Sequence, residues 1–367
     1  MDTKDGVISL RIYRSLDTVK KDTSMRIKRL RAWQPVCESA PQDWRSLLGQ
    51  ILVEIELSTG TIGLGVGGGG ISGIHVIDSV ISECVLNNSY DSPAEAHAAM
   101  VTHTSFYGRK GIVPMAISGV DLAIWDAFAK EQNLSVFELL SDQQPPDLLP
   151  MYQTVFDDRE ASAAVADGKQ AVKLHVERYG DKPDPADIRS LVKATRFKLG
   201  PGKSIMIDAF GRWNVETTLE IASAIVEFDI EWIEEPVGPE SLDAYSFLNA
   251  NSPIPIAGGE HEYLKEGFED LAVRQAVSVF QPDINWCGGL TTLIDIYRVA
   301  ADYGVRVVPH RGSEPYSLPA IAALDSEPLA ESARSWFTAI DGIPKPTRDG
   351  VKLNDGAGFG VAVAGDS

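Results

Sequence analysis

Residues 204–235 read SIMIDAFGRWNVETTLEIASAIVEFDIEWIEE, and the pattern in this stretch decides the fold. Two short, largely apolar runs, 204–208 and 230–234, lie on either side of a segment with the pattern of an amphipathic helix. Such runs are typical of strands that are buried on both faces, as in a parallel sheet. The stretch therefore predicts one strand–helix–strand unit.

The same unit repeats through the second half of the chain. Eight short apolar runs alternate with helical segments, and they cover residues 149–154, 170–175, 204–208, 230–234, 254–258, 277–283, 305–310 and 328–331. Eight such units predict an α/β fold of the (β/α)8 (TIM) barrel type, with a truncated last unit.

The residues before the barrel predict a separate α+β unit. A first strand opens at Met25, ILVEIELSTGTIGLGVG (51–67) has the alternation of a β-hairpin, and residues 116–140 have helical spacing. We therefore expect four segments: an N-terminal extension over 1–24, an α+β domain over 25–145, the barrel over 146–335, and a C-terminal segment over 336–367 that returns to the α+β domain.

Composition narrows the class of protein. The chain has 52 Asp and Glu against 33 Lys and Arg, a net charge of -19, which argues against a nucleic-acid surface. No apolar run reaches the about 18–20 residues that span a bilayer, and the charged N-terminus does not resemble a secretory signal. Three cysteines without CxxC spacing fit a reducing compartment. We expect a cytoplasmic enzyme.

Charged residues stand where the predicted strands end. The run 254–258, for example, stops at two glycines that are followed by Glu260, His261 and Glu262. Because TIM barrels place their chemistry at the carboxyl ends of the strands, we expect these side chains to meet in one mouth. From Asp208 onward they lie 21 to 27 residues apart, and the full set is Lys173, His175, Asp208, Glu234, Glu260, Asp283, His310 and Glu331.

Three of these strand-end residues, Asp208, Glu234 and Glu260, predict a metal site. Converging carboxylates repel one another unless a cation lies between them. The three residues offer only oxygen ligands, with no cysteine nearby, and this donor set favours a hard ion such as Mg²⁺.

At this point the sequence resembles the enolase superfamily, in its mandelate racemase subgroup, from about Met25 onward. The segments that carry the resemblance are AISGVDLAIWDAFAK (116–130), MIDAFGRWN (206–214), WIEEP (232–236), GGEHE (258–262), FQPDINWCGGLTTL (280–293) and VVPH (307–310). The last segments are most similar to the rhamnonate dehydratase branch. The resemblance implies that the α+β domain caps the barrel mouth.

The resemblance also implies the site. One Mg²⁺ per subunit is expected on Asp208, Glu234 and Glu260; Glu235 is the alternative to Glu234, but the residue two before Pro236 matches the family's position. His310 is the expected base, Asp283 orients it, Lys173 binds the substrate carboxylate, and Glu331 hydrogen-bonds the developing enediolate. A homo-oligomer of two to eight subunits is expected too.

The expected activity is that of a Mg²⁺-dependent acid-sugar dehydratase. Such an enzyme removes the proton α to a carboxylate and eliminates the β-hydroxyl, which gives a 2-keto-3-deoxy acid. His175 departs from the family, since many members carry a basic Lys there. If His175 is a second base, racemisation or epimerisation of a 2-hydroxy acid or sugar acid is the alternative; if it binds a hydroxyl, His310 works alone.

Three further residues are candidates for substrate binding. His261 is expected to contact a distal hydroxyl or the Asp283–His310 dyad, or else to support a metal ligand without touching the substrate. Arg311 replaces a small residue of the rhamnonate branch, so it either reaches a second carboxylate of a diacid substrate or pairs with Glu314. Trp286 packs either on a sugar face or within its own loop.

A nicotinamide-dependent oxidoreductase is the rival interpretation from another class. GLGVGGGG (63–70) contains Gly65-x-Gly67-x-x-Gly70 after a strand. The dinucleotide fingerprint needs a parallel strand–helix–strand context, whereas this strand belongs to a predicted hairpin. The resemblance instead implies a loop of the capping domain.

Overall fold

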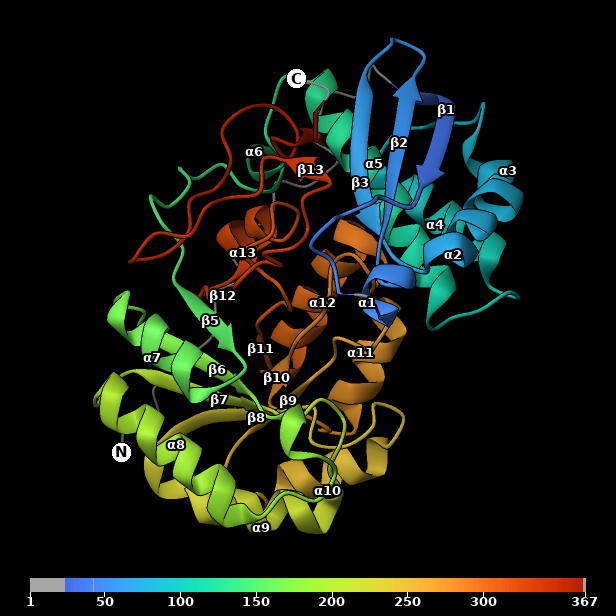
Figure 1. The fold of residues 1–367 in the computed structure, drawn as a ribbon. Helices are drawn as coiled ribbons and strands as arrows, with labels where there is room; N and C mark the ends of the chain where they lie inside the picture. Colours follow the sequence, from blue (N-terminus) through green and yellow to red (C-terminus); the bar gives the residue numbers. More distant parts are fainter. Residues whose placement is uncertain (1–23, 42, 366–367) are drawn as a thin grey trace, which may run out of the picture.

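The barrel predicted from the repeated units is confirmed. The computed structural model of the chain describes residues 24–41 and 43–365. Eight parallel strands form one curled sheet in the order β11-β10-β9-β8-β7-β6-β5-β12 (Figure 1). The strands are β5 (Met151–Val155), β6 (Ala171–His175), β7 (Ser204–Asp208), β8 (Ile230–Glu234), β9 (Ile256–Gly258), β10 (Val279–Phe280), β11 (Arg306–Val307) and β12 (Ala330–Glu331). Seven of them lie within the predicted runs, and β5 extends one residue beyond its run, to Val155.

Strands β11 and β12 are the two edges of this sheet, and a short contact joins them. The backbone N–H of Ser313, in the loop after β11, donates to the carbonyl of Glu331 on β12 over 2.8 Å. The last two strands are only two residues long, and this bond brings their carboxyl ends together. The ends of all eight strands therefore face one mouth.

Helices follow the strands as the pattern predicts. They are α7 (Asp158–Ala166), α8 (Pro185–Leu199), α9 (Val215–Ile225), α10 (Leu242–Asn251), α11 (Leu264–Val273), α12 (Gly289–Tyr303) and α13 (Leu318–Leu324), with 3-10 turns η3 (Glu177–Tyr179) and η4 (Val226–Phe228). Helix α9 begins at Val215 because Asn214 caps it: the Asn214 side chain accepts from Thr217 N–H over 2.9 Å.

The N-terminal domain is an antiparallel sheet covered by helices. Its strands run in the order β3-β2-β1-β4: β1 (Met25–Trp33), β2 (Ile51–Leu57), β3 (Ile62–Gly67) and β4 (Ser89–Tyr90). The helices are α1 (Trp44–Leu47), α2 (Gly70–Val76), the π-helical η2 (Ile77–Ile81), α3 (Ser82–Val85), α4 (Pro93–Thr104), α5 (Ile112–Glu131) and α6 (Val136–Leu140). The hairpin expected over 51–67 is β2–β3, so its strands are antiparallel.

Close packing between α5 and β3 explains the glycines of β3. A Cβ added to Gly63 or Gly65 would lie 2.1 Å from a backbone oxygen of α5, and one added to Gly67 would lie 2.6 Å from another. The glycines therefore let a helix lie directly on the strand. They serve helix packing in an antiparallel hairpin, which does not fit the dinucleotide fingerprint.

Helix α5 is also the one helix of the described residues that is long and apolar enough to cross a membrane, by length and composition. From the sequence we expect no such segment. In the structure 89% of its apolar window is buried inside the protein. It therefore packs as the core helix of the N-terminal domain.

The C-terminal segment lies against this domain. It contains the two-stranded pair β13 (Ile340–Asp341) and β14 (Ala362–Val363). Val136 N–H at the start of α6 donates to the Gly358 carbonyl, and Phe359 N–H donates to the Asp126 side chain, each over 2.9 Å. The proposed boundaries at 145 and 335 remain a prediction, and the expected extension over 1–24, apart from Ser24, lies outside the described residues.

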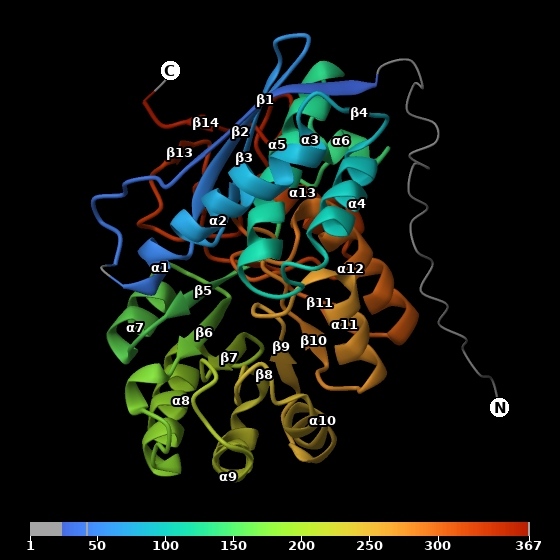
Figure 2. The same ribbon diagram turned by 90° about the vertical axis from the view of Figure 1, so that its right-hand side faces the viewer.

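The N-terminal domain lies beside the carboxyl ends of the barrel strands (Figure 2). The Trp286 indole N–H donates to the Gly49 carbonyl over 3.0 Å, and Lys110 pairs with Glu262 over 2.7 Å. Gly288 N–H donates to the Ser118 hydroxyl over 2.8 Å. Loops of this capping domain thus meet the loops that follow β9 and β10.

Candidate active site

The ammonium group of Lys173 lies among three carboxylates at the barrel mouth. Its Nζ is 2.6 Å from Glu234 and 2.7 Å from Glu331, and Asp208 lies 3.4 Å away. The Lys173 side chain is only 1% exposed. Three acids from β7, β8 and β12 therefore share one buried cation.

Glu234 is the most deeply enclosed of these acids. Its second oxygen accepts from the Gln281 side-chain amide over 2.5 Å. Burial raises the pKa of Glu234 well above its ordinary value; Lys173 opposes this, whereas Asp208 and Glu331 add to it. Lys173 alone therefore does not balance the negative charge around Glu234.

The donors of the predicted metal site fit Mg²⁺ in kind. Asp208, Glu234 and Glu260 are all buried, and all three offer oxygen. The whole mouth holds six buried carboxylates among the described residues, Asp208, Glu234, Glu235, Glu260, Asp283 and Glu331, against the two buried permanent cations Lys173 and Arg311. A bound divalent cation would offset part of this excess. The ligand assignment itself remains a prediction.

His310 and Asp283 form the expected pair. His310 Nδ1 lies 3.0 Å from Asp283 Oδ2, and its Nε2 lies 3.2 Å from Glu260. Burial opposes ionisation of Asp283, but Arg311 and His310 outweigh it and lower the pKa of this carboxyl. Asp283 thus remains charged and holds one ring nitrogen of His310 in place.

Arg311 binds Asp283 rather than the second expected partner, Glu314. Its guanidinium donates to Asp283 Oδ2 and lies 4.7 Å from the centre of the Trp286 ring. Glu314 is instead held by Arg334 through two bonds of 2.7 Å. The Arg311 N–H also donates to Glu331 over 2.9 Å, so this residue joins the ends of β10, β11 and β12.

His175 lies on the other side of the mouth from His310. Its ring is 4.9 Å from that of Phe156 and 5.3 Å from that of Phe210, and Nε2 is 3.8 Å from Asp208. Both histidines line one cavity of about 650 Å³, the mouth cavity, together with Lys173, Asp208, Glu260, Arg311 and Glu331. The structure thus brings the predicted acid–base candidates together.

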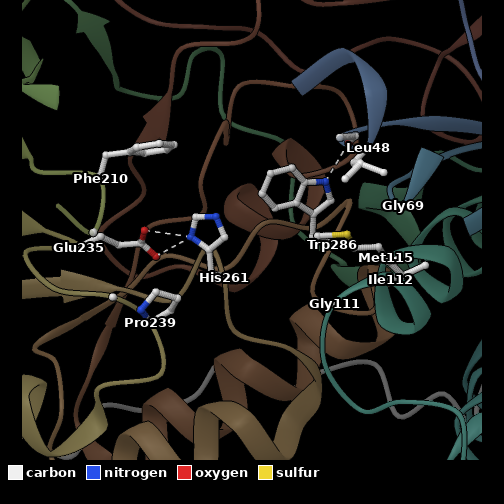
Figure 3. A pocket seen from close by; sticks show the side chains of 13 residues that line it. Leu48, Gly69, Gly111, Ile112, Met115, Phe210, Glu235, Pro239, His261 and Trp286 are labelled. Carbon is white, nitrogen blue, oxygen red and sulfur yellow. Dashed lines mark hydrogen bonds and ion pairs between the residues drawn. The ribbon is translucent and has the colours of Figure 1, made fainter. Parts of the chain in front are cut away.

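His261 faces a second cavity and is held by Glu235. Its Nδ1 lies 3.0 and 2.9 Å from the two Glu235 oxygens (Figure 3). Both residues line the cap cavity, about 490 Å³, which is also lined by Leu48, Ile112 and Met115 of the capping domain. Trp286 lines both cavities, and its ring centre lies 5.9 Å from that of His261 and 6.3 Å from that of His310.

Sequence reasoning did not foresee three of these contacts: Glu235 with His261, Gln281 with Glu234, and Arg334 with Glu314. Glu235 has a left-handed backbone, with φ of 38°, so its side chain does not follow the alternation of β8. Gln281 is uncharged, so the pattern of charged strand ends does not identify it. No regular spacing in the sequence identifies the pair of Arg334 and Glu314.

Comparison with known proteins agrees with this geometry. Residues 157–367 match the family model "Enolase C-terminal domain-like". Residues 46–141 match "Mandelate racemase / muconate lactonizing enzyme, N-terminal domain". The chain is 31% identical over 328 residues to an L-rhamnonate dehydratase from Saccharopolyspora erythraea, which covers 86% of this chain and 83% of that protein.

Solved structures share the whole architecture. A 3,6-anhydro-D-galactonate cycloisomerase from Zobellia galactanivorans superposes with a TM-score of 0.80 at 29% identity, over 93% of this chain and 97% of that one. A rhamnonate dehydratase from Gibberella zeae complexed with Mg superposes with a TM-score of 0.77 at 27% identity, over 93% and 94%. With both domain models matched and the strand-end acids in one mouth, the chain belongs to the enolase superfamily, among the mandelate racemase and muconate lactonizing enzymes.

Proposed function

We propose that the chain is a Mg²⁺-dependent acid-sugar dehydratase, a hydro-lyase that forms a 2-keto-3-deoxy acid. The observation that carries the proposal is the Asp283–His310 pair, whose histidine lines the same cavity as Lys173, Asp208, Glu260 and Glu331. The rhamnonate dehydratases among the relatives of this chain support the reaction class.

Asp208, Glu234 and Glu260 would hold the Mg²⁺ ion. When bound, the ion supplies Lewis-acid stabilisation of the negative charge that grows on the substrate carboxylate. The Mg complex of the Gibberella zeae relative supports the choice of ion. Within the chain, Lys173 adds a fixed positive charge beside the same acids, where it orients the substrate carboxylate.

His310 takes the proton from the α-carbon. Asp283 accepts from Nδ1, which leaves Nε2, beside Glu260, as the basic nitrogen on the cavity side. The electron pair of the broken C–H bond forms the double bond of the enediol, and Glu331 hydrogen-bonds the oxygen on which charge develops. Thr154 and Arg311 N–H hold Glu331 in position.

Elimination then breaks the C–O bond at the β-carbon. The protonated His310 returns its proton to the departing hydroxyl, which leaves as water, and the resulting enol tautomerises to the 2-keto-3-deoxy acid. One residue thus serves as base and then as acid, provided that the proton and the hydroxyl leave from the same face.

The substrate we propose carries a single carboxylate. Each cation that lines the mouth cavity already pairs with an acid of the chain: Arg45 with Asp43, Lys173 with Glu234, Arg311 with Asp283 and Arg334 with Glu314. A second substrate carboxylate would have to displace one of these acids. The arrangement therefore favours an aldonate over a diacid whose second carboxylate would bind Arg311.

The alternative function is racemisation or epimerisation at the α-carbon. It requires a second base on the opposite face, and the observation that favours it is that His175 and His310 line the same cavity. The phenyl rings of Phe156 and Phe210, which both pack near His175, would fix its imidazole for such a role.

Proton NMR in D₂O with Mg²⁺ and a panel of aldonates and aldarates tests both functions. Loss of the C2 proton with a 2-keto-3-deoxy product supports dehydration, and turnover of aldonates alone supports the single-carboxylate substrate. Exchange at C2 without elimination supports the alternative. If no compound of the panel reacts or exchanges its C2 proton, both functions are contradicted. The homo-oligomer and the cytoplasmic location remain predictions.

A further inference from the structure

The tightest group of metal-ligating side chains in the described residues is not the predicted Mg²⁺ set. It consists of Glu235, Glu260 and His261, whose ligand atoms all lie within 4.8 Å of one another. We propose that this group binds a second divalent cation, of the first-row transition series, beside the Mg²⁺ site. This proposal does not depend on the reaction proposed above.

The distances from His261 to the two glutamates suit one ion. His261 Nδ1 is 2.9 Å from the nearer Glu235 oxygen and 3.5 Å from Glu260 Oε1. Two ligands that are each about 2.1 Å from one metal lie about 3.0 Å apart at a right angle and about 3.4 Å apart at a tetrahedral angle. An ion can therefore replace the proton shared by His261 and Glu235 with little movement of either side chain.

The chemistry of the donors selects the class of ion. The imidazole nitrogen of His261 is a ligand that Zn²⁺, Co²⁺ and related ions prefer, whereas Mg²⁺ prefers oxygen. Asp208, Glu234 and Glu260 offer oxygen only. The two sites would share Glu260 as a bridging carboxylate, as in other two-metal centres, yet differ in the ions that they select.

The cap cavity gives this second site its own access. Glu235 and His261 both lie in its wall, next to Phe210 and Trp286. Figure 3 shows the second ring nitrogen of His261 pointing away from Glu235, toward the space between Phe210 and Trp286. An ion can thus reach the group from the capping-domain side without passing Lys173, which lines only the mouth cavity.

Charge supplies an independent argument. With the histidines neutral, as they are when they bind a metal, six buried carboxylates face two buried permanent cations at the barrel mouth, which leaves an excess of four negative charges. One Mg²⁺ halves this excess, and Glu235, which has no role in the proposed reaction, still contributes one of the remaining charges. A second divalent ion at Glu235 would bring the buried groups to neutrality before a substrate binds.

Cobalt binding to the full-length protein in saturating Mg²⁺ tests the proposal. We expect each protein chain to bind one equivalent of Co²⁺ that Mg²⁺ does not displace. The bound Co²⁺ should show the visible absorption bands of a site with a nitrogen ligand. His261→Asn and Glu235→Gln should each abolish this equivalent and leave Mg²⁺ binding in place. Asp208→Asn is the matched control, and it should weaken Mg²⁺ binding while the cobalt bands persist.

A second measurement needs no variant and so does not depend on the folding of one. Mn²⁺ added to ¹⁵N-labelled wild-type protein with Mg²⁺ present should show a nitrogen coupling in pulsed EPR. The proposal is overturned if all bound Co²⁺ is displaced by Mg²⁺, if the bands persist in His261→Asn, or if bound Mn²⁺ shows no nitrogen coupling. Each of these results would leave Glu235 and His261 as an ion pair.

Discussion

His310 Nδ1 lies 3.0 Å from Asp283 Oδ2, and these two residues come from the ends of neighbouring strands. The pairing leaves Nε2 as the nitrogen available to substrate. His310→Asn removes that basic atom, and we expect kcat to fall by about 10²–10⁴-fold while the fold is retained. The matching measurement is the rate of C2 deuterium incorporation. Lys352→Gln, an exposed change in the C-terminal segment, is the control; an equal loss in both variants would count against the assigned base.

The barrel and most of the residues at its mouth could be predicted because both follow from the regular repeat of the strand–helix unit along the sequence. Apolar runs recur with the strand–helix unit, and a charged residue that ends a parallel strand lies at the same edge as its neighbours. Lys173, His175, Asp208 and Glu260 accordingly line one cavity. No knowledge of side-chain conformation was needed for this result.

Choices between nearby partners could not be predicted. Arg311 had two candidate partners in the sequence analysis, a substrate carboxylate and Glu314, and in the structure it pairs with Asp283. Glu235 turns out of the β8 pattern through a left-handed backbone and holds His261. Such pairings depend on loop geometry, which hydrophobic periodicity does not describe.

Removal of metal should abolish turnover. Burial and the neighbouring acids raise the pKa of Glu234, so protons compete with Mg²⁺ for this carboxylate. We therefore expect the dissociation constant of Mg²⁺ to rise as the pH falls. Calorimetric titration at several pH values and in two buffers of different ionisation enthalpy measures both the affinity and the released proton. Turnover that persists in excess chelator would refute metal dependence.

Lys173→Met should destabilise the metal-free protein strongly. The substitution leaves Asp208, Glu234 and Glu331 buried without their shared cation. Removal of one partner from a buried charged group costs about 3–5 kcal/mol of unfolding free energy. Urea denaturation with and without Mg²⁺ measures the effect. Mg²⁺ should restore part of the loss, and an equal loss in both conditions would mean that the ion does not bind near these acids.

The Glu235–His261 pair should make stability depend on pH in the absence of metal. Burial opposes charging of the imidazole, but the bond to Glu235 and the charge of Glu260 outweigh it and raise the pKa of His261 to about 10. Since the folded pKa lies above the unfolded value, this stabilisation is fully present below the unfolded pKa of about 6.5 and is lost as the pH rises through about 10.

The measurement is urea unfolding in chelator at several pH values across that window. Wild type should lose unfolding free energy as the pH rises, and His261→Asn should lose less. The difference between the two curves isolates His261 from the other groups that titrate there. Parallel curves would show that His261 is not charged in the folded protein.

The contact between β3 and α5 should not tolerate a methyl group. In Gly65→Ala the new Cβ would lie 2.1 Å from the Gly119 carbonyl oxygen, which is a backbone atom and can move only with the helix. Overpacking of this kind costs about 1–3 kcal/mol or more. Gly108→Ala is the control, since its nearest neighbour is a side-chain methyl of Val113 at 3.3 Å. Thermal unfolding should show a clear loss for the first variant and a smaller one for the second. Equal stabilities of the two variants would mean that the close packing of α5 does not require the glycines of β3.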